Sequence, residues 1–476
     1  MGLAPEFLLF LNSRSFPMFA HWFKPLERRY GLDLRSLALL RLGLALAILS
    51  DLWVRWGNLL SDYSDQGNVP RSLLRDLWLP GYWSIHALSG SVWWQVGCFA
   101  IATLSALLLL IGYRTRWVIV ISWVLLVSLH NRNPLVVSAV DDVLRVMVFW
   151  AMFLPLGSSY SVDQALNMSP TPQPRRILTV AAFGLMVQQC YIHIGSALTT
   201  DMTAGGSALI VPFAWAAPLL LWSPIKTDLC RMVAVGIGIL LHLGVGLTLN
   251  LGLLPILGCF TWLVFIPSSV WDRWSERVYT PKQLGLKIYY DAECGFCKKV
   301  VHFLRTFLVL PRRVPLQIAQ SDPVIQTAME TQNSWVIVDW QGNHHYKWHG
   351  IAYVVSLSPI LHPLAKVLRW SPLMAIGTRI YETIANNRRF AGNFTKPFKY
   401  QSFTVRSVNA LSWAALLSLL LMTLLNLQSV TANHQQSTAL LRSDGPAMQY
   451  LAPLGQATRL DQSWNIFSPE SAKTNS

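Results

Sequence analysis

The sequence predicts a polytopic α-helical membrane bundle of about nine spans with an inserted α/β domain. The first observation is the composition, in which 53% of residues are hydrophobic and only 13% are charged, whereas soluble domains carry about 25% charged residues. The second is the recurrence of long apolar segments, many with Trp near their ends, as in the aromatic belts of membrane proteins. The third is one stretch, residues 286–392, in which strand-like and helix-like patterns follow each other.

Nine apolar segments approach or reach the length of about 20 residues that a helix needs to cross a bilayer. They are residues 34–53, 92–112, 117–131, 139–156, 177–198, 206–222, 231–250, 251–270 and 407–427. Two of them are short for a crossing, so we expect partial or tilted helices there. The same pattern divides the chain into five regions. These are an N-terminal interfacial segment (1–33), a transmembrane domain (34–275), an α/β domain (286–392), a final transmembrane helix (407–427) and a tail (428–476).

An odd number of spans places the two termini on opposite sides of the membrane. Lys and Arg gather on the side of the N-terminus and of residues 273–406, and the loops after the fifth and seventh spans contain neither. Because cytoplasmic loops are enriched in Lys and Arg, we expect the N-terminus and the α/β domain in the cytoplasm and the tail outside. The net charge of +15 is spread along these loops. Membrane lipids are therefore expected partners, and nucleic acid is not.

Two cysteines stand at the junction of an expected strand (286–290) and an expected helix (297–309). The junction reads Tyr290-Asp291-Ala292-Glu293-Cys294-Gly295-Phe296-Cys297. The dipole and the free N–H groups at a helix N-terminus stabilise a thiolate, and Lys298 and Lys299 add positive charge nearby. Because a thiolate is the group that attacks a disulfide, this arrangement suits thiol–disulfide exchange.

Two other interpretations of the cysteine pair stay open. The pair is either half of a zinc site or an inert structural pair. The histidines that could complete a zinc site are His302, His344, His345 and His349. Asp291 either takes up a proton during exchange or caps the turn before the helix. Four further cysteines occur singly in or beside apolar segments and are expected to pack as small hydrophobic residues. They are Cys98, Cys190, Cys230 and Cys259.

The elements expected around the CxxC follow a thioredoxin-like order. We expect strands at 286–290, 314–319, 334–339 and 343–348, and helices at 297–309, 323–330, 350–357, 362–370 and 373–388.

Residues from about Lys287 to Gly392 resemble the DCC family of thioredoxin-like proteins. The resemblance is carried by Asp291-x-x-Cys294-x-x-Cys297 and by Tyr381-x-x-x-Ala385-x-x-Arg388 in the closing helix. It implies a thiol–disulfide oxidoreductase in which Cys294 attacks and Cys297 resolves the mixed disulfide. Ala292 and Gly295 replace the Gly and Pro usual in that family, and no Pro precedes the strand 334–339, where thioredoxins have a cis-Pro. Since cytoplasmic thiols are normally reduced, we expect a reductant or a redox sensor.

A set of polar residues, the outer-face set, gathers at the predicted outer ends of spans and in outer loops. Its members are Asp65, Arg71, His130, Arg132, Asp141, Asp142, Arg145, Tyr191, His193 and His242. Charged side chains near the bilayer core are unfavourable unless they are paired or lie in a wet cavity. The set therefore predicts either an extracytoplasmic site or ion pairs that hold the helices together. In the second interpretation Arg145 pairs with Asp141 or Asp142, and Arg41 meets an acid such as Asp51.

Segments between about Leu34 and Trp271 resemble the HTTM family, a transmembrane domain shared with vitamin K-dependent γ-glutamyl carboxylases. They include Asp65-x-Gly67-x-x-Pro70-Arg71, His130-Asn131-Arg132-Asn133-Pro134 and Tyr191-x-x-x-Gly195. The resemblance implies a membrane enzyme that acts on a lipid, a quinone or a secreted peptide at the outer face. Leu198 stands where the carboxylases have a catalytic Lys. Because leucine cannot accept a proton, carboxylation by that mechanism is not expected.

The function hypothesis that follows is a membrane-bound thiol–disulfide oxidoreductase of the protein-disulfide reductase type, with a protein or small-molecule thiol or disulfide as partner. The alternative is the HTTM-type membrane enzyme, and a transporter or scaffold is the third reading. A quinone at the membrane domain is the one candidate cofactor, and no metal is expected. An HTTM domain followed by a DCC domain is a bacterial arrangement, so the bacterial inner membrane is the expected location.

Overall fold

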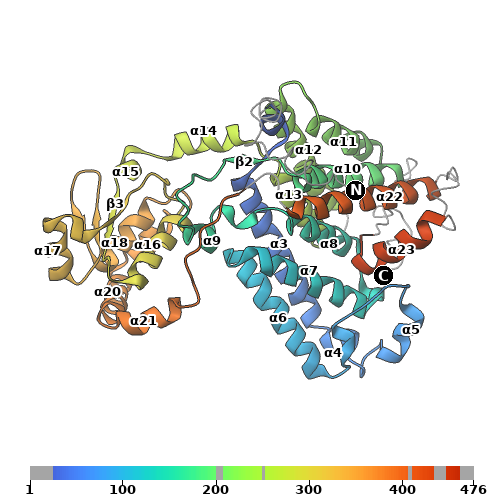
Figure 1. The fold of residues 1–476 in the computed structure, drawn as a ribbon, viewed down its shortest axis with the longest axis horizontal. Coiled ribbons are helices and arrows are strands. Elements are labelled where there is room, and N and C mark those ends of the chain that lie inside the picture. Colours follow the sequence, from blue (N-terminus) through green and yellow to red (C-terminus); the bar gives the residue numbers. More distant parts are fainter. Residues whose placement is uncertain (1–24, 200–206, 249–251, 406–409, 434–445, 461–476) are drawn as a thin grey trace, which may run out of the picture. The chain divides into compact units, whose positions relative to one another are not determined.

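The computed structural model describes residues 25–199, 207–248, 252–405, 410–433 and 446–460 (Figure 1). The chain forms two compact units. The helical unit comprises the residues up to Leu156, Pro174–Ser268 and the residues from Val405, and the α/β unit comprises Gly157–Gln173 and Ser269–Thr404. Most of the expected interfacial segment (1–33) and much of the expected tail (428–476) lie outside the described residues.

The helical unit contains a helix in every segment that was predicted to be a span. The long helices are α3 (Leu34–Trp56), α6 (Val92–Ile111), α7 (Thr115–Arg132), α8 (Ala139–Ala151), α10 (Val180–Thr199), α11 (Ser207–Leu221), α12 (Thr227–Thr248), α13 (Leu254–Leu263) and α22 (Ala410–Asn433). Short elements precede or connect them, namely β1 (Leu32–Asp33), α4 (Leu59–Tyr63), α5 (Leu74–Leu77) and β2 (Arg176–Ile177), and α23 (Pro446–Thr458) follows α22. Their periodic apolar residues form one continuous core.

Not all of these helices have the length and apolar character of a membrane span. Among the described residues three helices, α3, α6 and α12, are long and apolar enough, and a fourth span is counted if α13 and α14 (Ser268–Val278) form one bent crossing. Gly112, in the left-handed conformation at φ 70°, ends α6 where the apolar run stops. Nine crossings therefore remain a prediction, whereas the helices at those nine places are confirmed.

The α/β unit contains the strands and helices in the expected order. They are α9 (Val162–Ala165), α15 (Pro281–Leu284), β3 (Lys287–Tyr290), α16 (Gly295–Phe307), β4 (Leu316–Ile318), α17 (Pro323–Gln332), β5 (Val336–Val338), β6 (His344–His345), α18 (Lys347–Ser356), α19 (Leu364–Leu368), α20 (Ser371–Asn386) and α21 (Arg388–Thr395). The strand order is β4-β3-β5-β6. β3 is parallel to β4 and antiparallel to β5, and β6 is antiparallel to β5. β6 is shorter than expected because α18 already begins at Lys347, which has φ 48°.

Helices cover both faces of this small sheet because side chains alternate along β3. Ile288 is buried in one cluster with Val301 of α16 and Val354 of α18. Tyr289, the next residue, points to the other face and is buried with Ile325 of α17. β3, α16 and β4 thus form a βαβ unit whose helix begins at Gly295, between the two cysteines.

The loop 157–173, which connects two predicted spans, belongs to the α/β unit. Its short helix α9 packs against α16. The Met168 N–H donates to the Gln401 carbonyl at 2.8 Å. The Asn167 side chain donates to the Phe403 carbonyl at 3.0 Å and accepts from the Phe403 N–H at 3.1 Å. The loop and the segment around Gln401 therefore lie on one side of any membrane that the chain crosses, in agreement with the even number of predicted spans between them.

Candidate redox site

The two cysteines lie at the N-terminus of α16, where the chain leaves β3. Cys294 is the N-cap residue, and its Sγ accepts a hydrogen bond from the Cys297 N–H at 3.2 Å. The structure joins Cys294 and Cys297 in a disulfide, with their Cα atoms 5.2 Å apart. Cys294 is half-buried, whereas Cys297 is only 2% exposed. Cys294 is therefore the more exposed residue of the pair, and Cys297 is sheltered in the core of the unit.

The Asp291 carboxylate fixes the turn that leads into the cysteines. Its Oδ1 accepts from the Glu293 N–H at 3.0 Å and from the Gln320 side chain at 2.8 Å. Its Oδ2 pairs with Arg388 Nη1 at 3.5 Å. The Cys294 N–H donates to the Asp291 carbonyl at 3.3 Å. These contacts give Asp291 the turn-fixing role of the two that its position predicts, and its part in proton transfer stays a prediction.

The closing helix α20 anchors the strand next to the site. The Tyr381 hydroxyl accepts from the Trp335 N–H at 3.2 Å and contacts Ser334 Oγ at 3.1 Å. Ser334 directly precedes Trp335, and β5 begins one residue later at Val336. Burial raises the pKa of Tyr381, so its hydroxyl stays neutral. Tyr381 and Arg388 of the closing motif thus hold two separate backbone segments of the site.

The two lysines that follow the cysteine motif contact residues near the C-terminal end of the α/β unit. Lys299 Nζ donates to the Thr395 carbonyl at 2.6 Å. The Lys298 and Lys299 ammonium groups lie 5.2 and 5.8 Å from the centroid of the Tyr400 ring. Burial raises the pKa of Tyr400 to about 12, with a further contribution from Tyr290. The α16 N-terminus, with Cys294 as its N-cap, is consequently the feature of this site best placed to stabilise a thiolate.

Three of the four histidines that could have completed a zinc site have other contacts, because His344 lies 3.2 Å from the Tyr346 hydroxyl and the His345 and His349 rings stack. Burial, together with Arg305 and Lys298, lowers the pKa of His302 to about 4. His345 Nε2 lies 3.3 Å from Asp339, and its ring stacks on Tyr353 with centroids 4.1 Å apart. In the described part of the chain, the one group of three side chains close enough to share a metal lies in the helical unit. The zinc interpretation of the cysteine pair has no support in this geometry.

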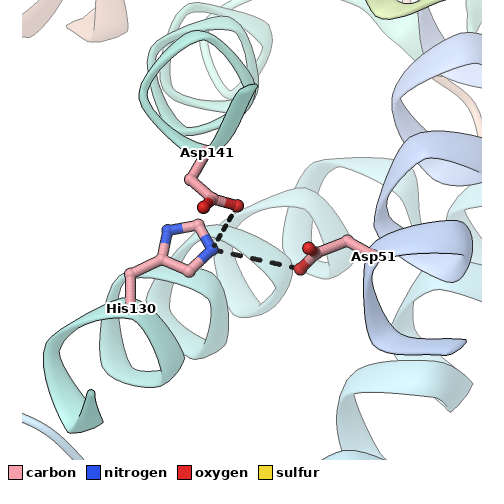
Figure 2. A group of neighbouring side chains, drawn as sticks. All are labelled: Asp51, His130 and Asp141. Carbon is pink, nitrogen blue, oxygen red and sulfur yellow. Dashed lines mark ion pairs between the residues drawn. The ribbon is translucent and has the colours of Figure 1, made fainter. Parts of the chain in front are cut away.

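That group consists of Asp51, His130 and Asp141, which come from α3, α7 and α8 (Figure 2). His130 Nε2 lies 3.3 Å from an Asp141 oxygen and 4.0 Å from an Asp51 oxygen. Arg55 bridges the two acids at 2.8 Å to Asp51 and 2.7 Å to Asp141. Sequence reasoning missed Asp51 and Arg55 as members of this group, although their i,i+4 spacing on α3 was a usable signal.

Arg145 determines which ring nitrogen of His130 carries the proton. An Arg145 nitrogen lies 2.8 Å from His130 Nδ1. Arginine has donors only, so Nδ1 accepts, and the neutral imidazole carries its proton on Nε2, facing Asp51 and Asp141. A metal ion would need the lone pair of that same nitrogen. The arrangement is therefore a buried ion-pair network rather than a metal cage. Arg145 also pairs with Asp142, one of its two predicted acids. Arg41 donates to the Leu156 carbonyl, and its pairing with an acid such as Asp51 stays a prediction.

The remaining outer-face residues fall into separate groups. Asp65 pairs with Arg71 at 2.8 Å and with Arg132 at 3.6 Å. His193 accepts from Trp262 Nε1 at 3.1 Å, and its other ring nitrogen lies 2.9 Å from the Gln189 carbonyl.

Two further members lie next to these groups. The His242 ring lies 5.4 Å from the ring of His193. Tyr191 donates to Thr423 of α22 at 3.1 Å. An apolar cavity of about 460 Å³ lies along α3 and α6 (for example against Leu49, Trp53 and Phe99), and none of the outer-face set lines it.

The comparison with known proteins covers the cysteine motif and the closing helix. Residues 288–392, from β3 into α21, match the DCC1-like thiol-disulfide oxidoreductase family. No curated protein and no solved structure matches the chain. The match does not reach the segments that resemble the HTTM family, and that resemblance stays a prediction. Residues 288–392 are therefore a DCC1-like thiol-disulfide oxidoreductase domain.

Proposed function

We propose that this chain is a membrane-anchored thiol–disulfide oxidoreductase that reduces disulfides of a protein or small-molecule partner. The observation that carries the proposal is the asymmetry of the cysteine pair. Cys294 is half-buried at the N-terminus of α16, and Cys297 is buried behind it. A helix N-terminus favours the thiolate at the accessible position, which is where a nucleophile is needed.

The exchange proceeds in two displacements. The Cys294 thiolate attacks one sulfur of the partner disulfide, whose S–S bond breaks, and the other partner sulfur leaves as a thiolate. Cys297 then gives its proton to the partner thiolate released in the first step and attacks Cys294 Sγ, so that the mixed disulfide breaks and the second partner sulfur leaves. The partner has gained two electrons and the cysteine pair has lost two, which yields the disulfide present in the structure. A dithiol donor must reduce the pair before the next cycle.

The apolar helices support the membrane anchor. α3, α6 and α12 are long and apolar enough to cross a bilayer. The distribution of Lys and Arg favours a cytoplasmic α/β unit, as the sequence analysis predicts, in the inner membrane of a bacterium. In that compartment a reduced cysteine pair acts as a reductant.

The test uses the purified full chain in detergent. Reduced protein is reacted with a disulfide-containing peptide at pH 7, and the products are identified by mass spectrometry. The Cys297→Ser variant should accumulate a mixed disulfide at Cys294, whereas the matched Cys294→Ser variant should not, because Cys297 is sheltered. Cys294 should react at least about tenfold faster than free cysteine. Equal reaction of the two variants, or a Cys294 no faster than free cysteine, would refute the proposal.

A second candidate function is the HTTM-type membrane enzyme at the outer face. The buried His130, held between Asp51 and Asp141, is the observation that favours it. The base that deprotonates the quinone in the carboxylases has no counterpart here. Leu198 stands in place of its Lys, and both ring nitrogens of His193 are engaged. The residues present therefore do not fit quinone deprotonation by that route.

The two candidates predict different effects of the same pair of substitutions. If the redox domain carries the function, Cys294→Ser abolishes it in cells and His130→Gln does not, provided that the variant protein accumulates. If the membrane domain carries the function, the order is reversed. Equal loss in both variants indicates that the two units act together.

A further inference from the structure

Helices α20 and α21 each present an exposed apolar face. Ile376, Ile380 and Ile384 are spaced by four residues, so they lie on one side of α20, and they are 51%, 51% and 40% exposed. On α21 Phe390 and Phe394 are 64% and 69% exposed, with ring centroids 5.4 Å apart. A run of large apolar side chains in water is unfavourable and marks a surface that contacts something else.

This face is not the one by which α20 packs into its domain. The packing face is formed by Gly377, which is buried against the Trp348 indole, and by Tyr381, which contacts Trp335. Ile376 stands directly before Gly377 and Ile380 directly before Tyr381, and Ile384 follows four residues after Ile380. All three therefore point away from the packing face. The domain is therefore folded without covering them.

Basic side chains accompany the apolar face. Between Pro359 and Thr404 the one acidic residue in the sequence is Glu382, which binds Lys347 at 2.7 Å. The exposed basic residues of the same stretch are Lys366, Arg369, Arg379, Arg389, Lys396 and Lys399. Exposed Ile and Phe beside Lys and Arg is the composition of helices that lie in the interface of anionic membranes.

We propose that α20 and α21 dock on the anionic lipid surface of the membrane that anchors the chain. The Ile and Phe side chains enter the boundary between headgroups and acyl chains, and the basic side chains contact lipid phosphates. α21 ends at Thr395 and the apolar helix α22 begins at Ala410, so a short stretch of chain connects this face to an apolar helix. The inference rests on the membrane anchoring proposed above and goes beyond it.

Docking has a consequence for the choice of partner. Arg388 is the first residue of α21 and binds Asp291, which fixes the turn before Cys294. A docked α21 thus holds the accessible sulfur beside the lipid surface. Thiols or disulfides carried close to that surface reach Cys294 more readily than those of freely soluble proteins.

The test places p-benzoylphenylalanine, a photoreactive residue, at position 380 or 394 of the full chain. The control position is 324, where Val324 of α17 is 69% exposed. Each protein is incorporated into nanodiscs of phosphatidylcholine alone or of phosphatidylcholine and phosphatidylglycerol in equal parts. After illumination, lipid adducts are measured by mass spectrometry of the labelled peptide. Positions 380 and 394 should form lipid adducts, several-fold more with phosphatidylglycerol, and position 324 should form few in either.

The paired substitution Arg389→Gln and Lys396→Gln should lower the adduct yield in the mixed nanodiscs several-fold. The proposal is overturned if positions 380 and 394 give no more lipid adduct than position 324, or if they crosslink to protein instead. A chain that does not enter nanodiscs at all refutes the membrane anchor itself. The exchange activity of Cys294, measured on the same samples, reports separately on the redox function.

Discussion

Arg388 pairs with Asp291 across 97 residues of sequence, with Nη1 3.5 Å from the carboxylate. Its other terminal nitrogen donates to Asn333 at 2.6 Å. One guanidinium therefore joins the turn before the cysteines to the segment before β5. A planar group with several donors can hold two acceptors in a fixed geometry, which a lysine cannot.

Arg388→Ala should slow thiol–disulfide exchange at Cys294 by about two- to fivefold, the factor equivalent to a partly exposed ion pair of ~0.5–1 kcal/mol. The pair is partly exposed, at 25% for Arg388 and 21% for Asp291. Stopped-flow measurement of the reaction between the reduced full chain and a disulfide peptide gives the rate. Arg388→Lys should recover part of it.

The neighbouring Arg389→Ala is the matched control, because Arg389 is exposed and is not a contact of Asp291. An equal slowing in the Arg389 and Arg388 variants would show that general charge, rather than the fixed turn, sets the rate.

Tyr381→Phe should leave the Trp335 N–H without its acceptor, which is the Tyr381 hydroxyl at 3.2 Å. An unpaired buried donor costs about 1–3 kcal/mol, so local opening of β5 becomes more frequent. Hydrogen exchange followed by mass spectrometry should show faster exchange in the peptide around residues 334–338. Tyr353→Phe provides a tyrosine control on α18, whose ring stacks on His345. Unchanged exchange in β5 after Tyr381→Phe would mean that the hydroxyl is dispensable.

The redox domain should lose stability as the pH falls from about 6.5 to about 4. Burial, with Arg305 and Lys298, lowers the pKa of His302 from 6.5 to about 4. In this window the unfolded chain binds a proton at His302 that the folded chain does not, so protonation favours unfolding. The stabilisation is fully present above pH 6.5.

His302→Gln should flatten the pH dependence of the thermal unfolding midpoint in that window, whereas substitution of the exposed His362 by Gln should not. Identical pH profiles for the wild-type chain and His302→Gln would remove His302 as the group responsible.

Asp141→Asn should destabilise the helical unit by about 3–5 kcal/mol, because it leaves a buried Arg55 without one of its two acids. The Asp141 side chain is 0% exposed, whereas Asp76 of α5 is an exposed acid. Asp76→Asn should cost about 1 kcal/mol or less. Thermal unfolding of both variants in detergent measures the difference. Equal midpoints would indicate that the network around His130 contributes little to folding.

Local sequence was sufficient for the elements that carry the chemistry. The short apolar run Leu286–Tyr290, the helical spacing after Cys297 and the cysteine spacing itself are all short-range patterns. They placed the strand, the helix and the thiols within a few residues of where the structure has them. The apolar runs likewise predicted each long helix of the helical unit, because an apolar segment removed from water must satisfy its own backbone N–H and C=O groups, as a helix does.

Only the tertiary structure decided which distant groups meet. The sequence does not pair Arg388 with Asp291, Tyr381 with the Trp335 amide, or Arg55 with both Asp51 and Asp141, because such contacts depend on how helices from distant parts of the chain pack. Packing also gave Cys294 and Cys297 unequal exposure, which the spacing of the two cysteines does not indicate. The sequence determined that two thiols stand at a helix terminus, and the packing of α16 determined which of them a partner can reach.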